Sequence, residues 1–388
     1  MRVQVVDPSA FTRPYDHALC SALGRLGVEV ELITSRFVHG DLPAPDGYRV
    51  REVFYRRAFG PPGSAIRSVS KLAAHPAGMA QLRHIAREAD LVHFQWLPVQ
   101  WLDVHLLPRA PLVLTAHDLL PREARLGQAR AQRRLYDAVD AVIVHSEYGR
   151  RTLAALGVDV AKIHVIHHGA FEHLALPAAD PLRLPAELDP HEGPVVLFFG
   201  LLRPYKGVEV LLEAWRHLER SGAVDHGALW IVGQPRMPLG PLFREAGPSV
   251  RFVARFVSED EVRALFGRAD VVVLPYARTE RLDHSGVLAT ALAFGKAIVL
   301  TEVGSFPEVA AEGAARLVPP ENPAALADAL RTLLADPDAR ERLGRHAQAT
   351  ARRSFSWDEA AVSTLRVYER VTAVSQGSLA DPPQSRPL

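Results

Sequence analysis

Two cations, Arg203 and Lys206, lie in a short loop whose neighbours could bind a phosphate group. The apolar run Val195–Phe199 is typical of a buried strand, Gly200 ends it, and an amphipathic helical pattern begins at Val208. A loop from the carboxyl end of a parallel strand to a helix N-terminus is where α/β sheets bind phosphate. A planar guanidinium and a mobile ammonium together suit a diphosphate. The alternative interpretation is a solvated loop with two ordinary surface cations.

This stretch resembles the phosphate loop of retaining nucleotide-sugar glycosyltransferases, specifically glycosyltransferase family 4 (glycosyl transferases group 1), which has the GT-B architecture. The resemblance covers about residues 1–375 and is most specific in 195–215 and 285–308. It implies an α/β fold with two doubly wound Rossmann-like domains facing a cleft. It also implies that Arg203 and Lys206 hold the donor diphosphate and stabilise it as it leaves.

A second stretch with chemical potential is the start of a helix at Ser285, Gly286 and Val287. Free amides at a helix N-terminus suit a phosphate or a sugar hydroxyl. The resemblance implies that these residues hold the donor through their backbone. Family members usually carry two glutamates here, of which the second binds the ribose, but this chain has Leu282 and Thr290 at those positions. The stretch resembles a subgroup that reads Ser-Gly-Val-Leu, and Thr290 stays a candidate donor contact.

Other donor-side candidates come from loops of the second half of the chain. Gly200 and Gly233 end strands, where a glycine allows close backbone approach. Arg255 and Phe256 resemble the family segment whose backbone reads the nucleotide base, although a capping box just after them explains the segment equally well. Glu280 could replace a lost carboxylate, with a solvated loop as the alternative.

His117 and Asp118 end another strand, and strand carboxyl ends face the ligand site of a doubly wound sheet. The imidazole could donate a hydrogen bond to a sugar hydroxyl while the carboxylate orients it. The alternative is a buried histidine that is satisfied by a backbone carbonyl. Family 4 enzymes often carry a His-Asp pair here, so the resemblance implies that His117 positions the donor sugar near its reacting carbon.

The sequence says least about the residues that contact the acceptor. Family members have a Gly-rich loop after the first strand, whereas this chain has no glycine before Leu23. We expect Arg13, Tyr15 and His17 to contact the acceptor, together with Asp118, although a loop-plus-helix role explains each of them as well. The end of a neighbouring strand adds His93, Gln95 and Trp96.

Short apolar runs alternate with helical patterns along the chain, which favours parallel sheets with helices on both faces. Strands are expected at 3–7, 28–34, 49–54, 91–96, 112–117, 141–145 and 164–168, and then at 195–200, 228–233, 250–256, 271–275, 297–303 and 316–318. Helices are expected at 15–26, 64–89, 128–139 and 146–156, and over most of 323–374.

A chain of 388 residues usually forms two domains. We expect an N-terminal acceptor-side domain over 1–175 and a proline-rich linker over 176–194. A C-terminal nucleotide-sugar-binding domain should then span 195–355. The resemblance implies that a helix over 356–375 crosses back to the N-terminal domain, and the polar residues 376–388 predict a disordered tail.

Composition argues against several classes of function. The net charge of +1 carries no electrostatic signature of a nucleic-acid partner. No Gly-x-Gly-x-x-Gly follows the first strand, which counts against a dehydrogenase, and no Gly-x-Ser-x-Gly supports a hydrolase. No His/Cys cluster has metal spacing, so we expect neither metal nor cofactor. One cysteine, Cys20, favours a reducing compartment, and no apolar run is long enough to span a membrane, so we expect a cytoplasmic protein.

Basic residues in the first half could bring the protein to the inner face of a membrane. The cluster comprises Arg122, Arg125, Arg130, Arg133 and Arg134. Such a face could meet anionic lipid headgroups or a lipid-linked acceptor. The alternative is a solvated helix surface.

The sequence therefore predicts transfer of a hexose from a nucleotide diphosphate sugar, of UDP or GDP type, to an acceptor hydroxyl with retention of anomeric configuration. The acceptor is expected to be a saccharide, a lipid-linked molecule or a small molecule. The alternative, motivated by the missing glutamates, is a catalytically inactive binding or scaffold protein with the GT-B fold. An epimerase or phosphorylase on the same fold has less support.

Overall fold

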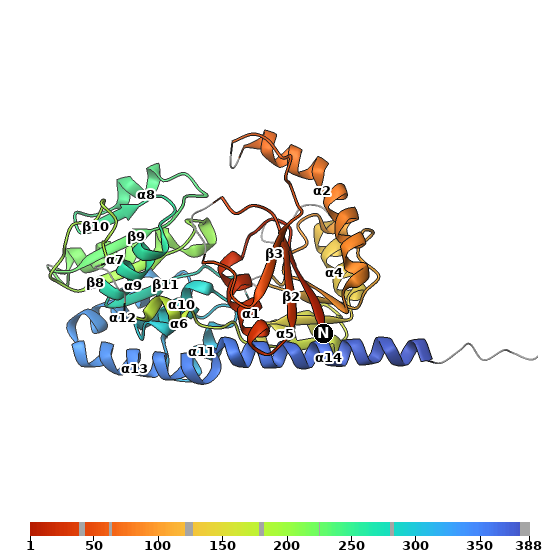
Figure 1. The fold of residues 1–388 in the computed structure, drawn as a ribbon. Coiled ribbons are helices and arrows are strands. Elements are labelled where there is room, and N and C mark those ends of the chain that lie inside the picture. Colours follow the sequence, from red (N-terminus) through yellow and green to blue (C-terminus); the bar gives the residue numbers. More distant parts are fainter. Residues whose placement is uncertain are drawn as a thin grey trace, which may run out of the picture. The chain divides into compact units, whose positions relative to one another are not determined.

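The structure is a computed structural model that describes residues 1–380 except 39–42, 62–63, 121–126, 178–181, 225 and 280–282. The chain forms two compact units (Figure 1). Unit 1 comprises Met1–His167 and the segment that begins at Trp357, and unit 2 comprises His168–Ser356. Each unit is built around one parallel sheet.

Unit 1 has a seven-stranded sheet in the order β3-β2-β1-β4-β5-β6-β7. The strands are β1 (Arg2–Asp7), β2 (Glu29–Thr34), β3 (Tyr48–Glu52), β4 (Leu91–Phe94), β5 (Leu112–Thr115), β6 (Ala141–Val144) and β7 (Ile163–Val165). Its α-helices are α1 (Arg13–Arg25), α2 (Ala65–Ile85), α3 (Gln100–Asp103), α4 (Gln128–Ala138), α5 (Glu147–Ala155) and α14 (Trp357–Ala380). Along β1, Val5 packs into one core and Val6 into another, because successive side chains of a strand point to opposite faces. Helices therefore cover both faces of the sheet.

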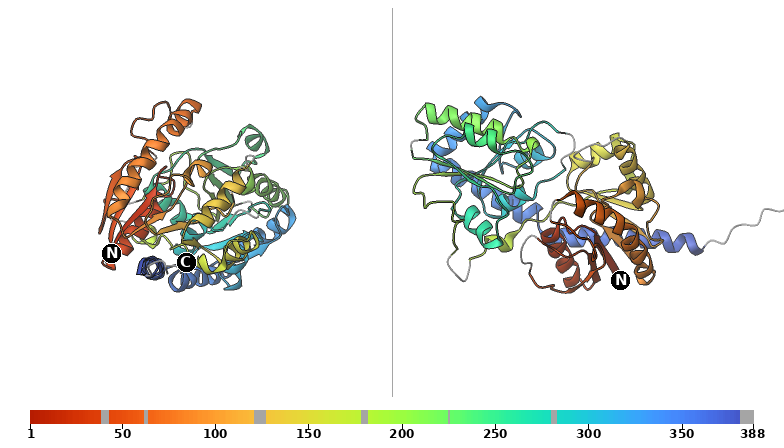
Figure 2. Two further views of the ribbon diagram at one scale, coloured as in Figure 1. Left: turned by 90° about the vertical axis from the view of Figure 1, so that its right-hand side faces the viewer. Right: turned by 90° about the horizontal axis from the view of Figure 1, so that it is seen from above.

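Unit 2 has a six-stranded sheet in the order β10-β9-β8-β11-β12-β13. The strands are β8 (Val195–Phe199), β9 (Ala228–Val232), β10 (Val250–Val253), β11 (Val271–Leu274), β12 (Ala297–Thr301) and β13 (Arg316–Val318). Its α-helices are α6 (Glu172–Ala175), α7 (Val208–Arg220), α8 (Gly240–Glu245), α9 (Glu259–Arg268), α10 (Gly286–Ala293), α11 (Phe306–Ala311), α12 (Pro323–Ala335) and α13 (Pro337–Ser354). Figure 2 gives two further views of both sheets and their helices.

Both sheets contain a point where the direction of strand order reverses. In unit 1 the reversal lies between β1 and β4, and in unit 2 it lies between β8 and β11. Ligands of doubly wound sheets bind outside the carboxyl ends of the strands at such a point. The fold therefore confirms the predicted α/β class and marks one candidate edge in each unit.

The last helix, α14, follows unit 2 in the chain but packs against α1 of unit 1. The Trp357 ring meets Tyr15 edge to face, and the Tyr368 hydroxyl lies 2.7 Å from Nδ1 of His93. The helix continues to Ala380, whereas the sequence predicted a disordered tail from residue 376. Propagation of an existing helix adds one hydrogen bond per residue without a new nucleus, which explains the extension.

The expected strands are all present, but their ends and one boundary differ. The observed strands mostly end one to three residues before the predicted carboxyl ends. The sequence placed a domain boundary at residue 175 and a linker over 176–194, whereas this stretch belongs to unit 2. Within it, Leu188 is buried in the core of unit 2, and the Ala170 amide donates to the Phe355 carbonyl at 2.6 Å. Isolated apolar residues among prolines show no periodicity, so the pattern did not reveal their burial.

Candidate functional site

The loop after β8 brings Arg203 and Lys206 to the strand-order reversal of unit 2. Pro204–Lys206 forms a single 3₁₀ turn, and α7 begins directly after it. Gly207 joins the two with φ +71°, and a Cβ atom on it would lie 1.8 Å from the Pro275 carbonyl oxygen. Only glycine fits here, because both the backbone conformation and the contact exclude a side chain. The loop is thus pinned to the segment that follows β11.

Lys206 is buried, with 8% of its surface exposed, and its ammonium bonds to a tyrosine. Its Nζ lies 2.5 Å from the Tyr276 hydroxyl and 4.5 Å from the centre of that ring. The same hydroxyl lies 3.1 Å from Oγ of Ser285. The Tyr276 backbone is fixed in turn, because Thr301 Oγ1 donates to its carbonyl at 2.7 Å. A cation from the first loop is therefore coupled to the start of α10.

The glycines that end β8 and β9 lie against each other. Gly200 has φ +114°, and a Cβ atom on it would lie 3.3 Å from both Lys206 Nζ and Val287 Cγ2. Gly200 therefore brings the first loop close to α10. A Cβ atom on Gly233 would lie 1.8 Å from the Gly200 carbonyl oxygen. This close packing by itself explains why the residue is a glycine. The donor contact that the sequence predicted for Gly233 is a separate role.

The N-terminus of α10 collects several polar groups. The Ser285 side chain does not cap the helix and bonds to Tyr276 instead. Next to Gly286, the ring of His168 stacks on His284 with centroids 4.9 Å apart. Burial lowers the pKa of His168 to about 4, so its ring is neutral at physiological pH. Its Nδ1 lies 2.7 Å from the Gly169 carbonyl and donates to it, which leaves Nε2 as an acceptor.

Two other predicted donor contacts are engaged within the protein. Thr290 donates its hydroxyl proton to the Gly286 carbonyl at 2.9 Å inside α10. The Arg255 guanidinium bonds to both Glu187 and Glu261, and these carboxylates raise its pKa above the ordinary value. The sequence predicted that the backbone of this segment reads the nucleotide base. The ion pairs involve only the Arg255 side chain, so they do not test that prediction. Half of the Phe256 surface is exposed.

The expected capping box after these residues is present, between Ser258 and Glu261. Glu280 and Leu282 lie outside the described residues, so the structure gives no contacts for them.

In unit 1, His117 lies at the carboxyl end of β5 within a hydrogen-bonded row. Its Nε2 is 3.0 Å from Gln95 Oε1, and its Nδ1 is 3.4 Å from Nε2 of His145. The His145 Nδ1 donates to the Ile166 carbonyl at 2.9 Å. The prediction that Asp118 orients the imidazole stays a prediction, and the contacts of the ring nitrogens add Gln95 and His145, which the sequence did not assign to this role. Their positions on neighbouring strands could not be read from the local motif.

Aromatic rings hold His117 from two sides. Trp96 stacks on it with centroids 5.1 Å apart, and Tyr15 meets it edge to face at 4.7 Å. The Trp96 indole donates to Thr12 Oγ1 at 2.9 Å, which joins the loops after β4 and β1. Trp96 and Gln95 therefore belong to the site through His117.

The predicted acceptor residues on α1 are more buried than expected. Tyr15 is 6% and Arg13 is 7% exposed. The ring of His17 bonds through Nδ1 to the Tyr48 hydroxyl at 2.9 Å, near the amino end of β3. These side chains lie on the inner face of α1. The motif alone did not distinguish residues of this helix face from residues of the preceding loop.

A carboxylate that the sequence analysis missed shapes the loop after β1. Asp7 accepts hydrogen bonds from the Ser9 amide at 3.2 Å and the Thr12 amide at 3.0 Å. Burial raises the pKa of Asp7 and raises that of its neighbour Asp16 further. Ala10 adopts φ +54° in the same loop, a conformation that glycine would adopt more readily. The loop thus bends without a glycine.

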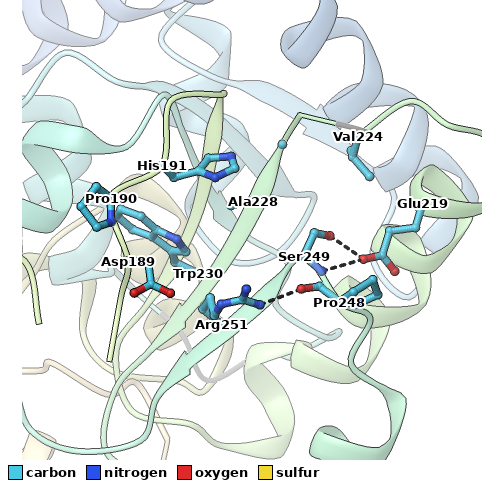
Figure 3. A pocket seen from close by; sticks show the side chains of 11 residues that line it. Asp189, Pro190, His191, Glu219, Val224, Ala228, Trp230, Pro248, Ser249 and Arg251 are labelled. Atoms are coloured by element: carbon cyan, nitrogen blue, oxygen red, sulfur yellow. Dashed lines mark hydrogen bonds between the residues drawn. The ribbon is translucent and has the colours of Figure 1, made fainter. Parts of the chain in front are cut away.

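A cavity of about 430 Å³ lies in unit 2, at the amino ends of β9 and β10 (Figure 3). Its polar lining includes Glu219, Ser249 and Arg251. Glu219 accepts from the amide of Ser249 at 3.3 Å and from its hydroxyl, and Arg251 donates to the Pro248 carbonyl at 2.6 Å. This cavity lies at the opposite edge of the sheet from Lys206 and shares no residue with the phosphate loop.

Two features are absent from the described part of the chain. No group of three or more His, Cys, Asp or Glu residues there could hold a metal ion. Across the same residues, no helix is both long and apolar enough to cross a membrane.

Comparison with known proteins agrees with this geometry. The family Glycosyl transferases group 1 matches residues 193–336, and Glycosyltransferase Family 4 matches residues 15–170. The D-inositol 3-phosphate glycosyltransferase of Kineococcus radiotolerans is 32% identical over 91% of this chain and 88% of its own length.

Solved structures show the same fold. The sucrose-phosphate synthase of Thermosynechococcus elongatus has a TM-score of 0.75 at 21% identity, over 96% of this chain and 100% of that one. HepE of Anabaena, solved in complex with UDP-glucose, has a TM-score of 0.68 at 18% identity, over 97% of this chain and 100% of that one. With both families covering the two halves and a relative matched along nearly its whole length, this chain belongs to glycosyltransferase family 4 and has the GT-B fold.

Proposed function

We propose that the protein transfers a hexose from a UDP- or GDP-sugar to an acceptor hydroxyl with retention of anomeric configuration. The observation that carries the proposal is the Lys206–Tyr276–Ser285 arrangement at the strand-order reversal of unit 2. A buried cation held at the start of a helix suits a diphosphate, since amides and ammonium both favour negative charge. The named activity of the Kineococcus radiotolerans relative and the UDP-glucose bound to Anabaena HepE support a nucleotide-sugar donor.

In this mechanism the protein acts mainly by electrostatics and positioning. Negative charge grows on the diphosphate as it leaves, and Arg203 and Lys206 stabilise it there. Amides at the start of α10 hold the sugar and phosphate, and His117 positions the sugar. The acceptor attacks the face from which the diphosphate departs, and the diphosphate takes the acceptor proton. The configuration is then retained without a protein nucleophile.

A second candidate is a binding protein that has lost catalysis. Its motivation is the position of the second family glutamate, which Thr290 occupies. The threonine hydroxyl donates within its own helix at 2.9 Å, so it does not reproduce a carboxylate that accepts two ribose hydroxyls. This candidate shares the donor site and differs only in turnover.

Nucleotide binding tests the donor assignment. Thermal shift and calorimetry would cover UDP, GDP, ADP and dTDP with their common sugars. A ligand at 100 times its Kd stabilises the folded state by about 2.7 kcal/mol. We expect one nucleotide class to stabilise the wild type and not the Arg203→Ala/Lys206→Ala variant. Arg216→Ala is the matched control, because Arg216 pairs with Glu245 at the surface of α7. Absence of binding to any nucleotide at millimolar concentration would overturn the donor assignment.

Turnover and stereochemistry then separate the two candidates. The acceptor panel includes D-inositol 3-phosphate, which the relative's name identifies, and simple glycosides. Proton NMR of the product reports the anomeric configuration. Transfer with retention supports the enzyme, transfer with inversion contradicts the proposed mechanism, and tight donor binding without transfer or donor hydrolysis favours the binding protein.

We also propose that unit 1 contacts an anionic membrane surface, through a different patch from the predicted one. Arg122 and Arg125 of the predicted cluster lie outside the described residues, and Arg133 is bonded to Asp137 on its own helix. Arg130 and Arg134 are exposed. Exposed apolar side chains instead gather at the start of α2 and just before it. They are Phe59, Ile66 and Val69, which are 68%, 59% and 66% exposed.

Exposed Arg56 and Arg57 lie beside this apolar patch in sequence. Apolar side chains next to cations favour an anionic lipid interface. Sedimentation with phosphatidylglycerol vesicles should retain the wild type and release Ile66→Ser/Val69→Ser. Equal sedimentation with phosphatidylcholine vesicles, or no sedimentation at all, would contradict this contact.

A further inference from the structure

Three side chains of unit 1, outside the residues discussed so far, form a hydrogen-bonded relay. The Tyr55 hydroxyl lies 2.8 Å from Nδ1 of His75, and Nε2 of His75 lies 2.5 Å from Oδ1 of Asp103. His75 and Asp103 are fully buried, and Tyr55 is half-buried. The residues come from the loop after β3, from the long helix α2 in Figure 1, and from α3. Folding alone brings them together.

The partners of Asp103 indicate the direction of the hydrogen bonds in the relay. The Asp103 carboxylate accepts at both oxygens, because Oδ2 takes the Val99 amide at 2.8 Å and Oδ1 faces His75. A carboxylate oxygen that faces Nε2 favours the tautomer with its proton on that nitrogen, and in this tautomer Nδ1 is an acceptor. Burial raises the pKa of the Tyr55 hydroxyl well above its ordinary value, so the phenol keeps its proton. Tyr55 donates that proton to His75, and its oxygen then offers only lone pairs to other partners.

The backbone of Tyr55 is strained in a way that aims the phenol. Its φ is +55°, in the left-handed region that non-glycine residues rarely adopt. Packing maintains this conformation: the Tyr55 ring stacks on His75, and the preceding Phe54 is buried against Gly78 of α2. A Cβ atom on Gly78 would lie 2.5 Å from Phe54 Cδ1. Backbone strain of this kind concentrates at functional sites.

The neighbours of the phenol place it at the carboxyl edge of the unit 1 sheet. Tyr55 follows the carboxyl end of β3, and Ser9, two residues after the carboxyl end of β1, is near enough to the phenol to lower its pKa. Lys71 lies on the ring face, with its ammonium 4.9 Å from the ring centre. The strand-order reversal between β1 and β4 belongs to the same edge, as does His117 after β5.

We propose that the Tyr55 oxygen accepts a hydrogen bond from a hydroxyl of the acceptor substrate, and that Asp103, acting through His75, keeps this oxygen an acceptor. Tyr55 is then a specificity-determining contact, and His75 and Asp103 are positioning residues. The proposal rests on the proposed transfer to a hydroxyl acceptor. An acceptor that places a hydroxyl at Tyr55 binds, and an analogue without that hydroxyl loses the hydrogen bond.

Two nearly isosteric variants test the relay. Tyr55→Phe keeps the ring and removes the hydroxyl. Asp103→Asn presents an amide N–H to His75, so the ring must move its proton to Nδ1, and the phenol must turn its own proton outward. With UDP-glucose or the donor identified above, and D-inositol 3-phosphate and methyl glucoside as probe acceptors, each variant should raise the acceptor KM about tenfold. The donor KM should not change.

A matched control and a spectroscopic signature separate this role from simple support of the fold. Tyr136→Phe removes another tyrosine hydroxyl of unit 1, which donates to the Leu119 carbonyl at 2.9 Å. It should change stability without changing the acceptor KM. Nitrogen-15 shifts of His75 should report a proton on Nε2 in the wild type and on Nδ1 in Asp103→Asn.

The outcomes are distinct. If Tyr55→Phe loses stability but keeps the wild-type acceptor KM, the relay only supports the fold. If Asp103→Asn raises the acceptor KM further in the Tyr55→Phe background, Asp103 does not act through the phenol, and the proposal is overturned. If the wild type transfers the sugar to neither probe acceptor, the proposed acceptor class is overturned. The role of Tyr55 as a contact of these acceptors is then overturned as well. The nucleotide-binding test of the donor site stands apart from that result.

Discussion

The Lys206 ammonium lies 2.5 Å from the Tyr276 hydroxyl, although the two residues are 70 positions apart in the chain. The contact exists because β8 and β11 are neighbours in the sheet of unit 2, so the loops at their carboxyl ends meet. Tyr276 is 1% exposed and also contacts Ser285. The hydroxyl therefore fixes where the cation stands relative to the start of α10.

Removing that hydroxyl should impair turnover more than stability. Tyr276→Phe keeps the ring under Lys206 but deletes a hydrogen bond to a charged group, which is worth about 1.5–3 kcal/mol. We expect kcat/KM for the donor to fall by about 10- to 100-fold. Tyr136→Phe is the control, since the buried Tyr136 hydroxyl bonds to the Leu119 carbonyl in unit 1. An unchanged kcat/KM in Tyr276→Phe would show that Lys206 does not need this partner.

The phosphate loop should tolerate no side chain at Gly207. Gly207→Ala combines a left-handed backbone with a Cβ atom 1.8 Å from the Pro275 carbonyl oxygen, so the loop must move. Gly27→Ala has a similar φ of +82° but no atom within 4 Å of the added carbon, so it isolates the backbone strain. We expect about 1 kcal/mol of lost stability for Gly27→Ala, and more for Gly207→Ala together with loss of nucleotide binding. Calorimetric titration and thermal unfolding measure both, and equal effects would contradict the steric explanation.

Asp16 should make the protein less stable as the pH rises. Burial raises its pKa well above 3.8, and the charge of Asp7 adds to the effect. Above pH 3.8 the unfolded chain releases this proton while the folded state keeps it, so the free energy of unfolding falls until the pH passes the pKa of the folded state. Asp16→Asn removes this term, so its Tm relative to the wild type should increase as the pH is raised from 4. The exposed control Asp137→Asn should show no such trend, and a flat difference for Asp16→Asn would contradict the buried-proton account.

The sequence predicted most of the framework and part of the site, for identifiable reasons. Buried parallel strands are continuous apolar runs, which is why β8 and its loop with Arg203 and Lys206 were found. Tyr276 was missed because its role depends on the pairing of β8 with β11, which no local motif encodes. The contact of Gln95 with His117 was missed for the same reason, since Gln95 reaches His117 from the end of the neighbouring strand β4.

Long-range packing also explains the other differences. Tyr15 carries a ring that is typical of a sugar contact, but the return of α14 buries it against Trp357. Leu188 belongs to a proline-rich stretch that is typical of a linker, yet it packs into the core of unit 2. In the relay, His75 is one of two histidines in α2, and only its distances to Tyr55 and Asp103 distinguish it from the other.

The last prediction concerns the coupling of Gln95 to His117. Gln95 is 1% exposed, and its Oε1 lies 3.0 Å from Nε2 of His117. If Gln95 acts by orienting the imidazole, its removal matters only while the imidazole is present. We expect His117→Ala to lower kcat at least 100-fold and Gln95→Leu to lower it about 10-fold, each a loss of transition-state positioning. The double variant should then match His117→Ala alone, because residues that act as a unit are not additive. Initial rates at saturating donor measure the cycle, and multiplicative losses would mean that Gln95 acts on the reaction without His117.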